Sequence, residues 1–194
     1  MNAFALSTAD ARPASSRLPA RRTSGTRLAQ SVIDTPLGPL TALASDAGLM
    51  GLWFDRQLHE PGPLAADEDA SQQWIAQARV ELAEYFAGRR RTFDVPLAPQ
   101  GTPFQEAVWR RLVAIAFGET TSYGRIASQV GKPSAARAVG AAVGRNPISI
   151  LVPCHRVVGE DGSLTGYAAG LPRKEALLRL EGVLEESLFD ASAP

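Results

Sequence analysis

Residues 121–144 read TSYGRIASQVGKPSAARAVGAAVG, and this stretch decides the fold of the second half of the chain. Its pattern predicts two short helices, Tyr123–Val130 and Ser134–Gly144, with a sharp turn between them at 131–133. Two short helices joined by a turn that contains Gly are typical of a helix-turn-helix. The stretch therefore predicts a mostly helical C-terminal domain that binds DNA. Plain helix packing is the alternative interpretation.

The second of these helices is built from small residues. A helix that reads the major groove presents long polar side chains to the base edges. Here Ala135, Ala136 and Gly140 are small, and Arg137 is the one long side chain. Small side chains let a helix sit close to the minor groove. We therefore expect this helix to contact the minor groove of double-stranded DNA, with Arg137 aimed at the base stack.

The first half of the chain has a different pattern of apolar and polar residues. Period-2 alternation and turn residues predict strands, and apolar residues at helical spacing predict one helix. The predicted strands span 31–35, 40–45, 49–54 and 92–95, and the predicted helix spans 71–87. The fold class expected from this pattern is a small α/β domain, with a short antiparallel sheet plus a helix, before the helical domain.

Composition and the positions of proline residues predict the domain boundaries. Residues 1–28 are rich in Ala, Ser, Pro and Arg, which predicts a disordered basic arm; an organellar transit peptide is the alternative. The α/β domain is expected over 29–96 and a proline-containing linker over 97–101. The DNA-binding domain is expected over 102–185, followed by a tail at 186–194.

Bulk composition excludes several classes of protein. The formal net charge is zero, which argues against a protein that coats nucleic acid by charge alone. One cysteine cannot form an internal disulfide, and one cysteine with two histidines makes a structural zinc site unfavourable. No apolar run has the length that a transmembrane helix needs. We expect a cytoplasmic monomer without metal or cofactor.

The single cysteine lies in Pro153-Cys154-His155-Arg156, after an apolar run at 148–152 that predicts a buried strand. Neighbouring cations lower a thiol pKa, and an adjacent His is a candidate base. A cysteine that merely packs in the core is the alternative. In an extended segment Cys154 and His155 would point to opposite faces, so a water or a turn must connect them. Glu181 is a candidate partner that orients His155.

Five motifs now occur in a fixed order: TSYG at 121–124, AARAVG at 135–140, GRNP at 144–147, PCHRV at 153–157 and GYA at 166–168. Together they resemble the O6-alkylguanine-DNA alkyltransferases, also called methylated-DNA–protein-cysteine methyltransferases. The resemblance covers about residues 30–185 and is strongest in the second half.

The resemblance implies a reaction centred on Cys154. This residue would take the alkyl group from O6-alkylguanine, and from O4-alkylthymine, irreversibly and once per protein. His155 would remove the thiol proton through a water, held by Glu181. Tyr123 would rotate the target phosphate and donate to the guanine ring. Arg137 would fill the gap left by the base flipped through the minor groove.

The resemblance also assigns the surroundings of the reacting atoms. Asn146 would brace the turn between the DNA-binding helix and the active-site segment. The Val157 carbonyl and the Ala168 amide would mark the base edges, and Tyr167 would wall the pocket. Ser149 stands where some relatives have Pro, and Ala169 stands where many have Gly, which affects the size of the adduct accepted.

Three other functions remain open at this point. A relative that binds lesions without reacting would lack the acceptor cysteine, which is present here. A cysteine hydrolase would turn over repeatedly. A helix-turn-helix regulator without chemistry would leave Tyr123, Asn146 and the Cys154 motif unexplained.

Overall fold

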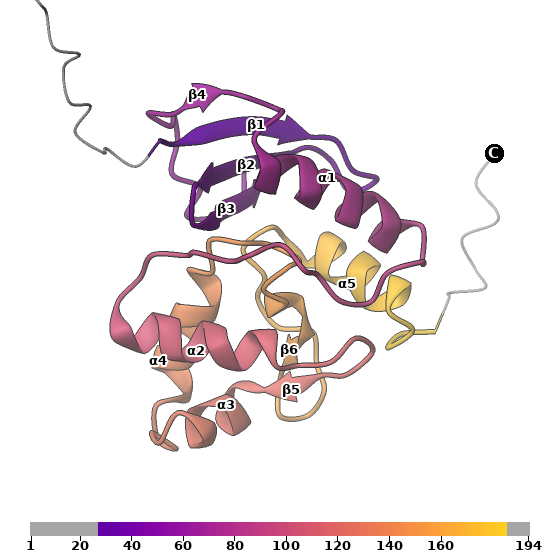
Figure 1. Cartoon of the computed structure of the whole chain (residues 1–194). Helices are drawn as coiled ribbons and strands as arrows, with labels where there is room; N and C mark the ends of the chain where they lie inside the picture. Colours follow the sequence, from indigo (N-terminus) through magenta and orange to yellow (C-terminus); the bar gives the residue numbers. More distant parts are fainter. Residues whose placement is uncertain (1–26, 186–194) are drawn as a thin grey trace, which may run out of the picture.

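The computed structural model describes residues 27–185 of the 194-residue chain. The predicted tail at 186–194 lies outside this range, as does the predicted arm apart from its last two residues. In Figure 1 a sheet with helix α1 forms the upper part, helices α2, α3 and α4 form the lower part, and α5 lies between them. Among the described residues no helix is long and apolar enough to span a membrane.

The upper part is a four-stranded sheet covered by one helix. The strands are β1 (Ala29–Ile33), β2 (Leu40–Ser45), β3 (Gly48–Phe54) and β4 (Asp67–Glu68), and the helix is α1 (Gln73–Phe86). The sheet order is β3-β2-β1-β4, with β1 and β3 antiparallel to β2 and β4 parallel to β1.

Helix α1 packs on this sheet through one apolar face. Ile75, Ala78, Leu82 and Tyr85 recur every three or four residues, and all four are buried. The helix was predicted from an overlapping set of apolar residues at helical spacing, which included Trp74 and Phe86 but not Tyr85. The expected α/β domain with a short antiparallel sheet and a helix is confirmed.

The predicted strand at 92–95 is wrong, because this segment forms no strand. Its backbone is held instead by the buried carboxylate of Glu81, which accepts hydrogen bonds from the Asp94 and Val95 amides. The short strand β4 lies in a segment predicted to be loop. Strand β1 also begins and ends two residues earlier than predicted. It ends earlier because the hydroxyl of Thr35 is hydrogen-bonded within the turn that follows, to the Gly38 carbonyl and the Leu37 amide.

The lower part is mostly helical, as predicted. Its elements are α2 (Pro103–Val113), β5 (Thr121–Ser122), α3 (Tyr123–Gln129), α4 (Ala136–Gly144), β6 (Val157–Val158) and α5 (Leu171–Leu180). Thr102 and Gln105 form a capping box at the start of α2. Helices α3 and α4 pack against each other and both pack against α2, which gives the expected helix-turn-helix. Trp109 Nε1 donates to the Ala142 carbonyl and ties α2 to α4.

The apolar run at 148–152 is not the strand that the sequence predicted. Only Ile148 bridges to a strand, through hydrogen bonds that flank Leu52 of β3. The chain then turns tightly, with Ile150 at φ 70° and the Leu151 amide bonded to the Ser149 carbonyl. A left-handed conformation is rare for a β-branched residue, so this turn is locally strained.

The two parts meet along the outer edge of β3. Leu49 pairs with Leu97 of the linker, and Leu52 pairs with Ile148. Gly48 begins this edge with φ 149°, where a Cβ would collide with the Pro96 carbonyl. Glycine there lets the linker lie directly against the sheet, and the active-site segment continues the same edge.

Candidate active site

Cys154 opens a single 3-10 turn, η1 (Cys154–Arg156), and is only 5% exposed. The chain is therefore not extended here: a turn, one of the two expected ways to connect Cys154 with His155, is present, and it places three residues around one turn rather than on alternating faces. Asn146 Nδ2 donates a hydrogen bond to Cys154 Sγ at 3.1 Å. Burial raises the pKa of the thiol and outweighs the Asn146 hydrogen bond and the Lys174 charge, which both act in the opposite direction.

The expectation that adjacent cations lower the thiol pKa is thus wrong for the unreacted protein. Arg156 is paired with Glu181, since its Nε and Nη2 donate to the two carboxylate oxygens at 2.8 and 2.9 Å. His155 is fully buried, and burial lowers the pKa of its imidazole, so the ring is neutral near pH 7. The thiol therefore needs a proton acceptor if it is to react as thiolate.

The contact between His155 and Glu181 fixes which ring nitrogen can accept a proton. Its Nε2 lies 2.9 Å from Glu181 Oε1. Because the carboxylate is ionised and can only accept, the proton of the neutral ring resides on Nε2. Nδ1 is then the basic nitrogen, and it is a buried atom without a hydrogen-bond partner among the described residues.

Glu181 is the centre of a buried network that joins three elements. The residue ends α5, and its Oε1 accepts from His155, from Arg156 and from Tyr85 Oη of α1, the last at 2.7 Å. Burial alone would raise the pKa of this carboxyl group. The hydrogen bonds from His155 and Arg156 outweigh burial and lower the pKa to about 2. The group is therefore a permanent anion near neutral pH.

Asn146 follows α4 and organises the strained segment before Cys154. Its Nδ2 lies within hydrogen-bond distance of the Ile148 and Val152 carbonyls, at 3.2 and 2.8 Å, as well as of the thiol. Its Oδ1 accepts from the Ile148 amide. One side chain thus links the end of α4 to both ends of the turn and to the sulfur.

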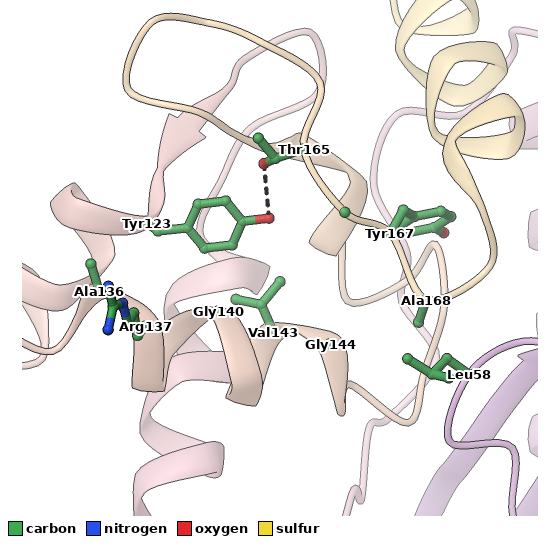
Figure 2. A pocket seen from close by; sticks show the side chains of 11 residues that line it. Leu58, Tyr123, Ala136, Arg137, Gly140, Val143, Gly144, Thr165, Tyr167 and Ala168 are labelled. Atoms are coloured by element: carbon green, nitrogen blue, oxygen red, sulfur yellow. Dashed lines mark hydrogen bonds between the residues drawn. The ribbon is translucent and has the colours of Figure 1, made fainter.

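A cavity of about 530 Å³ opens beside this network, between α3, α4 and the loop before α5 (Figure 2). Tyr123 begins α3 and its ring lies over Gly140, where an added Cβ would sit 3.7 Å from the ring. Figure 2 shows Arg137 at one end of the cavity and Tyr167, Ala168 and Leu58 at the other. The lining residues are Leu58, Tyr123, Ala136, Arg137, Gly140, Val143, Gly144 and Thr165–Ala168.

The structure brings most of the predicted site residues to this cavity or to the network behind it. Ala135 precedes α4 as its N-cap residue and does not line the cavity. Ser149 and Ala169 are buried, and Ser149 Oγ donates to Gln57 of the N-terminal domain at 2.9 Å. The Val157 carbonyl accepts a hydrogen bond from Lys174 Nζ. Within residues 27–185 no cluster of three acidic, His or Cys side chains is arranged to hold a metal ion.

Two family models match the chain, and their boundaries follow its two parts. A model described as the ribonuclease-like domain of 6-O-methylguanine DNA methyltransferase matches residues 28–99. A model described as the DNA-binding domain of the same protein matches residues 103–183. The chain belongs to the 6-O-methylguanine DNA methyltransferase family.

Known relatives of this family cover most of the chain. A methylated-DNA–protein-cysteine methyltransferase of Mycobacterium bovis is 50% identical over 149 residues, which are 77% of this chain and 89% of the relative. One of Methanosarcina acetivorans is 45% identical over 155 residues, 78% of this chain and 97% of the relative. The crystal structure of Mycobacterium tuberculosis OGT in complex with DNA superposes with a TM-score of 0.75 at 48% identity, covering 79% and 93% of the two chains.

The methyltransferase is thus a DNA repair enzyme that acts on a protein cysteine. Three residues at or next to this site were not predicted from the sequence. Tyr85 follows the apolar spacing of α1 and reads as core, although its hydroxyl reaches Glu181. Lys174 is a lysine with no exposed surface, a position that helix periodicity alone could have indicated. Thr165 carried no signal apart from its place just before the Gly166-Tyr167-Ala168 motif.

Lys174 adds a buried charge to the methyltransferase site. Its Nζ donates to the Val157 and Thr165 carbonyls at 2.5 and 2.6 Å. Burial lowers the pKa of this ammonium group to about 8, and the Cys154 charge acts in the opposite direction. A cation held here favours the thiolate, so it partly compensates the cost of burying the sulfur.

Proposed function

We propose that the protein transfers the alkyl group of O6-alkylguanine in double-stranded DNA onto Cys154 Sγ, irreversibly and once per molecule. The observation that carries this proposal is the number of cysteines. The family acts on a protein cysteine, and the full sequence contains one, Cys154. Next to that cysteine in sequence is His155, whose Nε2 lies 2.9 Å from Glu181 Oε1, and residues of the helix-turn-helix line a cavity.

The thiol is activated by the His155–Glu181 pair. His155 Nδ1 takes the thiol proton through a bridging water, and the imidazolium that forms is stabilised by the Glu181 anion at Nε2. The thiolate then receives a hydrogen bond from Asn146 and the field of the Lys174 ammonium group. Burial raises the pKa of the free thiol, so this assistance is needed near neutral pH.

The transfer itself is one displacement. Sγ attacks the alkyl carbon, the S–C bond forms, the C–O6 bond breaks, and its electron pair goes to guanine. The proton lost by the thiol balances the charge on the departing base. A hydrogen bond from Tyr123 Oη to the base makes it a better leaving group. The thioether is not hydrolysed, so each protein molecule reacts only once.

A base inside the duplex cannot reach a buried thiol, so the target nucleotide is flipped out at a cost of a few kcal/mol. Helix α4 presents Ala136 and Gly140 along the cavity, and these small residues permit close approach to the minor groove. Arg137 enters the stack in place of the base, and Tyr123 turns the target phosphate. We propose that a single protein molecule performs these steps on DNA.

The pocket for the flipped base lies between Tyr123 and the loop at 165–168. Tyr167 walls it, and the Val157 carbonyl and Ala168 amide read the base edges. Ala169 and Ser149 lie outside the cavity lining, so they limit bulky adducts through the packing of the wall rather than by direct contact. We propose methyl and other small alkyl groups as substrates, on O4 of thymine as well.

Intact-protein and peptide mass spectrometry after incubation with a methylated duplex tests this function. One methyl group should appear on the Cys154 peptide, with one lesion consumed per protein. Cys154→Ser should bind the duplex with an affinity close to wild type and gain no mass. Several lesions consumed per protein would indicate a hydrolase, and binding without mass gain by the wild type would indicate a lesion-binding protein without chemistry.

A further inference from the structure

Thr165 lies in the loop between β6 and α5, on the wall of the cavity that faces Tyr123. Its Oγ1 donates a hydrogen bond to Tyr123 Oη at 3.3 Å, drawn as the dashed line in Figure 2. Both residues line the cavity, and both are half-buried. The Thr165 hydroxyl therefore meets the phenol oxygen at the surface that a flipped base would occupy.

The backbone of Thr165 is held by a buried cation. Lys174 Nζ donates to the Thr165 and Val157 carbonyls at 2.6 and 2.5 Å, and Lys174 has no exposed surface. Val157 belongs to β6, which pairs with β5, the strand directly before Tyr123. The two hydroxyl groups are thus anchored to the same small sheet from its two strands.

We infer that Thr165 is a positioning residue for alkyl transfer, which holds the Tyr123 phenol so that its proton points at the departing base. The inference rests on the proposed function, in which Tyr123 donates to that base. A phenol has one proton and can accept as well as donate. When Thr165 supplies a proton to the phenol oxygen, the phenol's own proton remains free for the base.

The same hydrogen bond also strengthens the donor. A hydroxyl that accepts a hydrogen bond is polarised and donates a stronger one, because bonds in a chain reinforce each other at low dielectric. Thr165 Oγ1, Tyr123 Oη and the base would then form one line of donors toward the atom that gains negative charge, while Lys174 holds the backbone carbonyl of Thr165. No atom of Thr165 exchanges a bond in the reaction, so its contribution acts through Tyr123 alone.

A double-mutant cycle on the full-length protein tests this inference. The rate of methyl transfer from a methylated duplex is measured at saturating DNA for wild type, Thr165→Val, Tyr123→Phe and the double variant. Loss of one hydrogen bond of about 1 kcal/mol predicts a roughly five-fold slower transfer for Thr165→Val. In the Tyr123→Phe background the same change should alter the rate less than about two-fold, because the coupled partner is absent.

Three further measurements separate positioning from folding. Thr165→Ser retains the hydroxyl and should restore at least about half of the wild-type rate, within the scatter of a single hydrogen bond. Alkylation of Cys154 by iodoacetamide involves no departing base, so Thr165→Val should leave that rate unchanged. Thr92→Val makes the same chemical change at an exposed threonine of the N-terminal domain and should transfer at the wild-type rate.

The outcomes that overturn the inference are distinct from those that overturn the proposed function. If Tyr123→Phe is slow and Thr165→Val is not, or if Thr165→Val slows both backgrounds equally, Thr165 does not act through Tyr123. If iodoacetamide alkylation slows in parallel, the loop packs around Cys154 and the inference fails. If Tyr123→Phe itself transfers at the wild-type rate, the proposed role of Tyr123 fails, and the inference fails with it.

Discussion

Tyr85 Oη donates to Glu181 Oε1 at 2.7 Å, and this hydrogen bond joins α1 of the N-terminal domain to the end of α5 across 96 positions of sequence. The same oxygen is 2.9 Å from His155 Nε2. The N-terminal domain therefore contacts the atom that is proposed to orient and stabilise the histidine.

Tyr85→Phe removes this donor while preserving the ring that packs against Phe93 and Phe117. Without the Tyr85 hydrogen bond, one fewer donor offsets the negative charge of Glu181 Oε1. That oxygen then stabilises the imidazolium form of His155 more strongly. We expect the pKa of His155 to rise from its depressed value. The chain contains two histidines, so NMR titration can follow His155 with exposed His59 as the internal reference. An unchanged His155 titration would mean that the Tyr85 contact is only structural.

Glu181→Gln tests the carboxylate that supports the proposed proton acceptor, His155. It removes the anion that stabilises the His155 imidazolium and also leaves the Arg156 charge buried without its partner. We expect normal binding of methylated DNA, and a transfer rate at pH 7 that is lower by about ten-fold or more, since positioned acid–base groups contribute on the order of 100-fold or more.

Raising the pH should recover part of the Glu181→Gln rate, because solvent then ionises the thiol. Since burial raises the pKa of Cys154, the recovery should begin only well above neutral pH. Removing one partner of a buried ion pair costs on the order of 3–5 kcal/mol, so thermal unfolding must be measured at each pH. A folded variant that transfers at the wild-type rate throughout would remove Glu181 from the mechanism.

The Glu181 carboxyl group should also make stability depend on pH. Its pKa falls from a reference value of 4.5 to about 2 on folding, so the unfolded chain binds its proton first as the pH drops. The stabilisation is complete above the unfolded value and is lost as the pH falls from about 4.5 to about 2. His155 acts in the same direction, since its pKa is also lowered.

Urea denaturation at a series of pH values between 7 and 2 measures this dependence. The free energy of unfolding should fall toward acid, and the fall should be shallower in Glu181→Gln, which has no proton to take up at that position. A parallel fall in both proteins would assign the acid sensitivity to other carboxyl groups. Glu175→Gln, at a half-exposed position on the same helix, provides the matched control.

Arg137 separates base flipping from chemistry. It lies at the end of the cavity away from Tyr167 (Figure 2) and is not among the described residues that hydrogen-bond to Cys154, His155 or Glu181, so its removal should not alter the reacting groups. We expect Arg137→Ala to slow transfer from duplex DNA by about ten-fold or more if it replaces lost stacking worth about 1–3 kcal/mol per base. Transfer from free O6-methylguanine should remain near the wild-type rate, and Arg145→Ala serves as a control cation just after α4. Equal losses on both substrates would assign Arg137 to folding.

Local patterns predicted the elements that depend on local physics. Helix α3 and helix α4 follow from the turn at 131–133 and from helical spacing. The motif around Cys154 predicted a reactive site because His and Arg are unusual neighbours for a packing cysteine. These features require only residues that are close in sequence.

Features that depend on distant contacts could not be read in the same way. An apolar run such as 148–152 is equally compatible with a strand and with a buried turn, and the Asn146 side chain decides between them. The pKa of the Cys154 thiol is raised by burial, and Arg156 is hydrogen-bonded to Glu181, which is 25 positions away in sequence. Tyr85 could be predicted as core from its spacing, but its polar end finds a partner only once α5 is in place.

The edge of β3 makes the two halves of the chain complementary to each other. Leu52 pairs with the backbone of Ile148, and the Tyr85 hydroxyl donates to Glu181. The N-terminal half alone would therefore have an unpaired sheet edge and a buried hydroxyl without a hydrogen-bond acceptor. An open edge of this kind pairs readily with a matching segment. A chain cut after Pro99 would keep the linker pairing of Leu49 with Leu97 in the first fragment and could be rejoined without a covalent bond. The thioether formed on Cys154 would be permanent. Alkylation of two reassembled fragments would therefore show, after the fragments separate, that two proteins fused to them had been in contact.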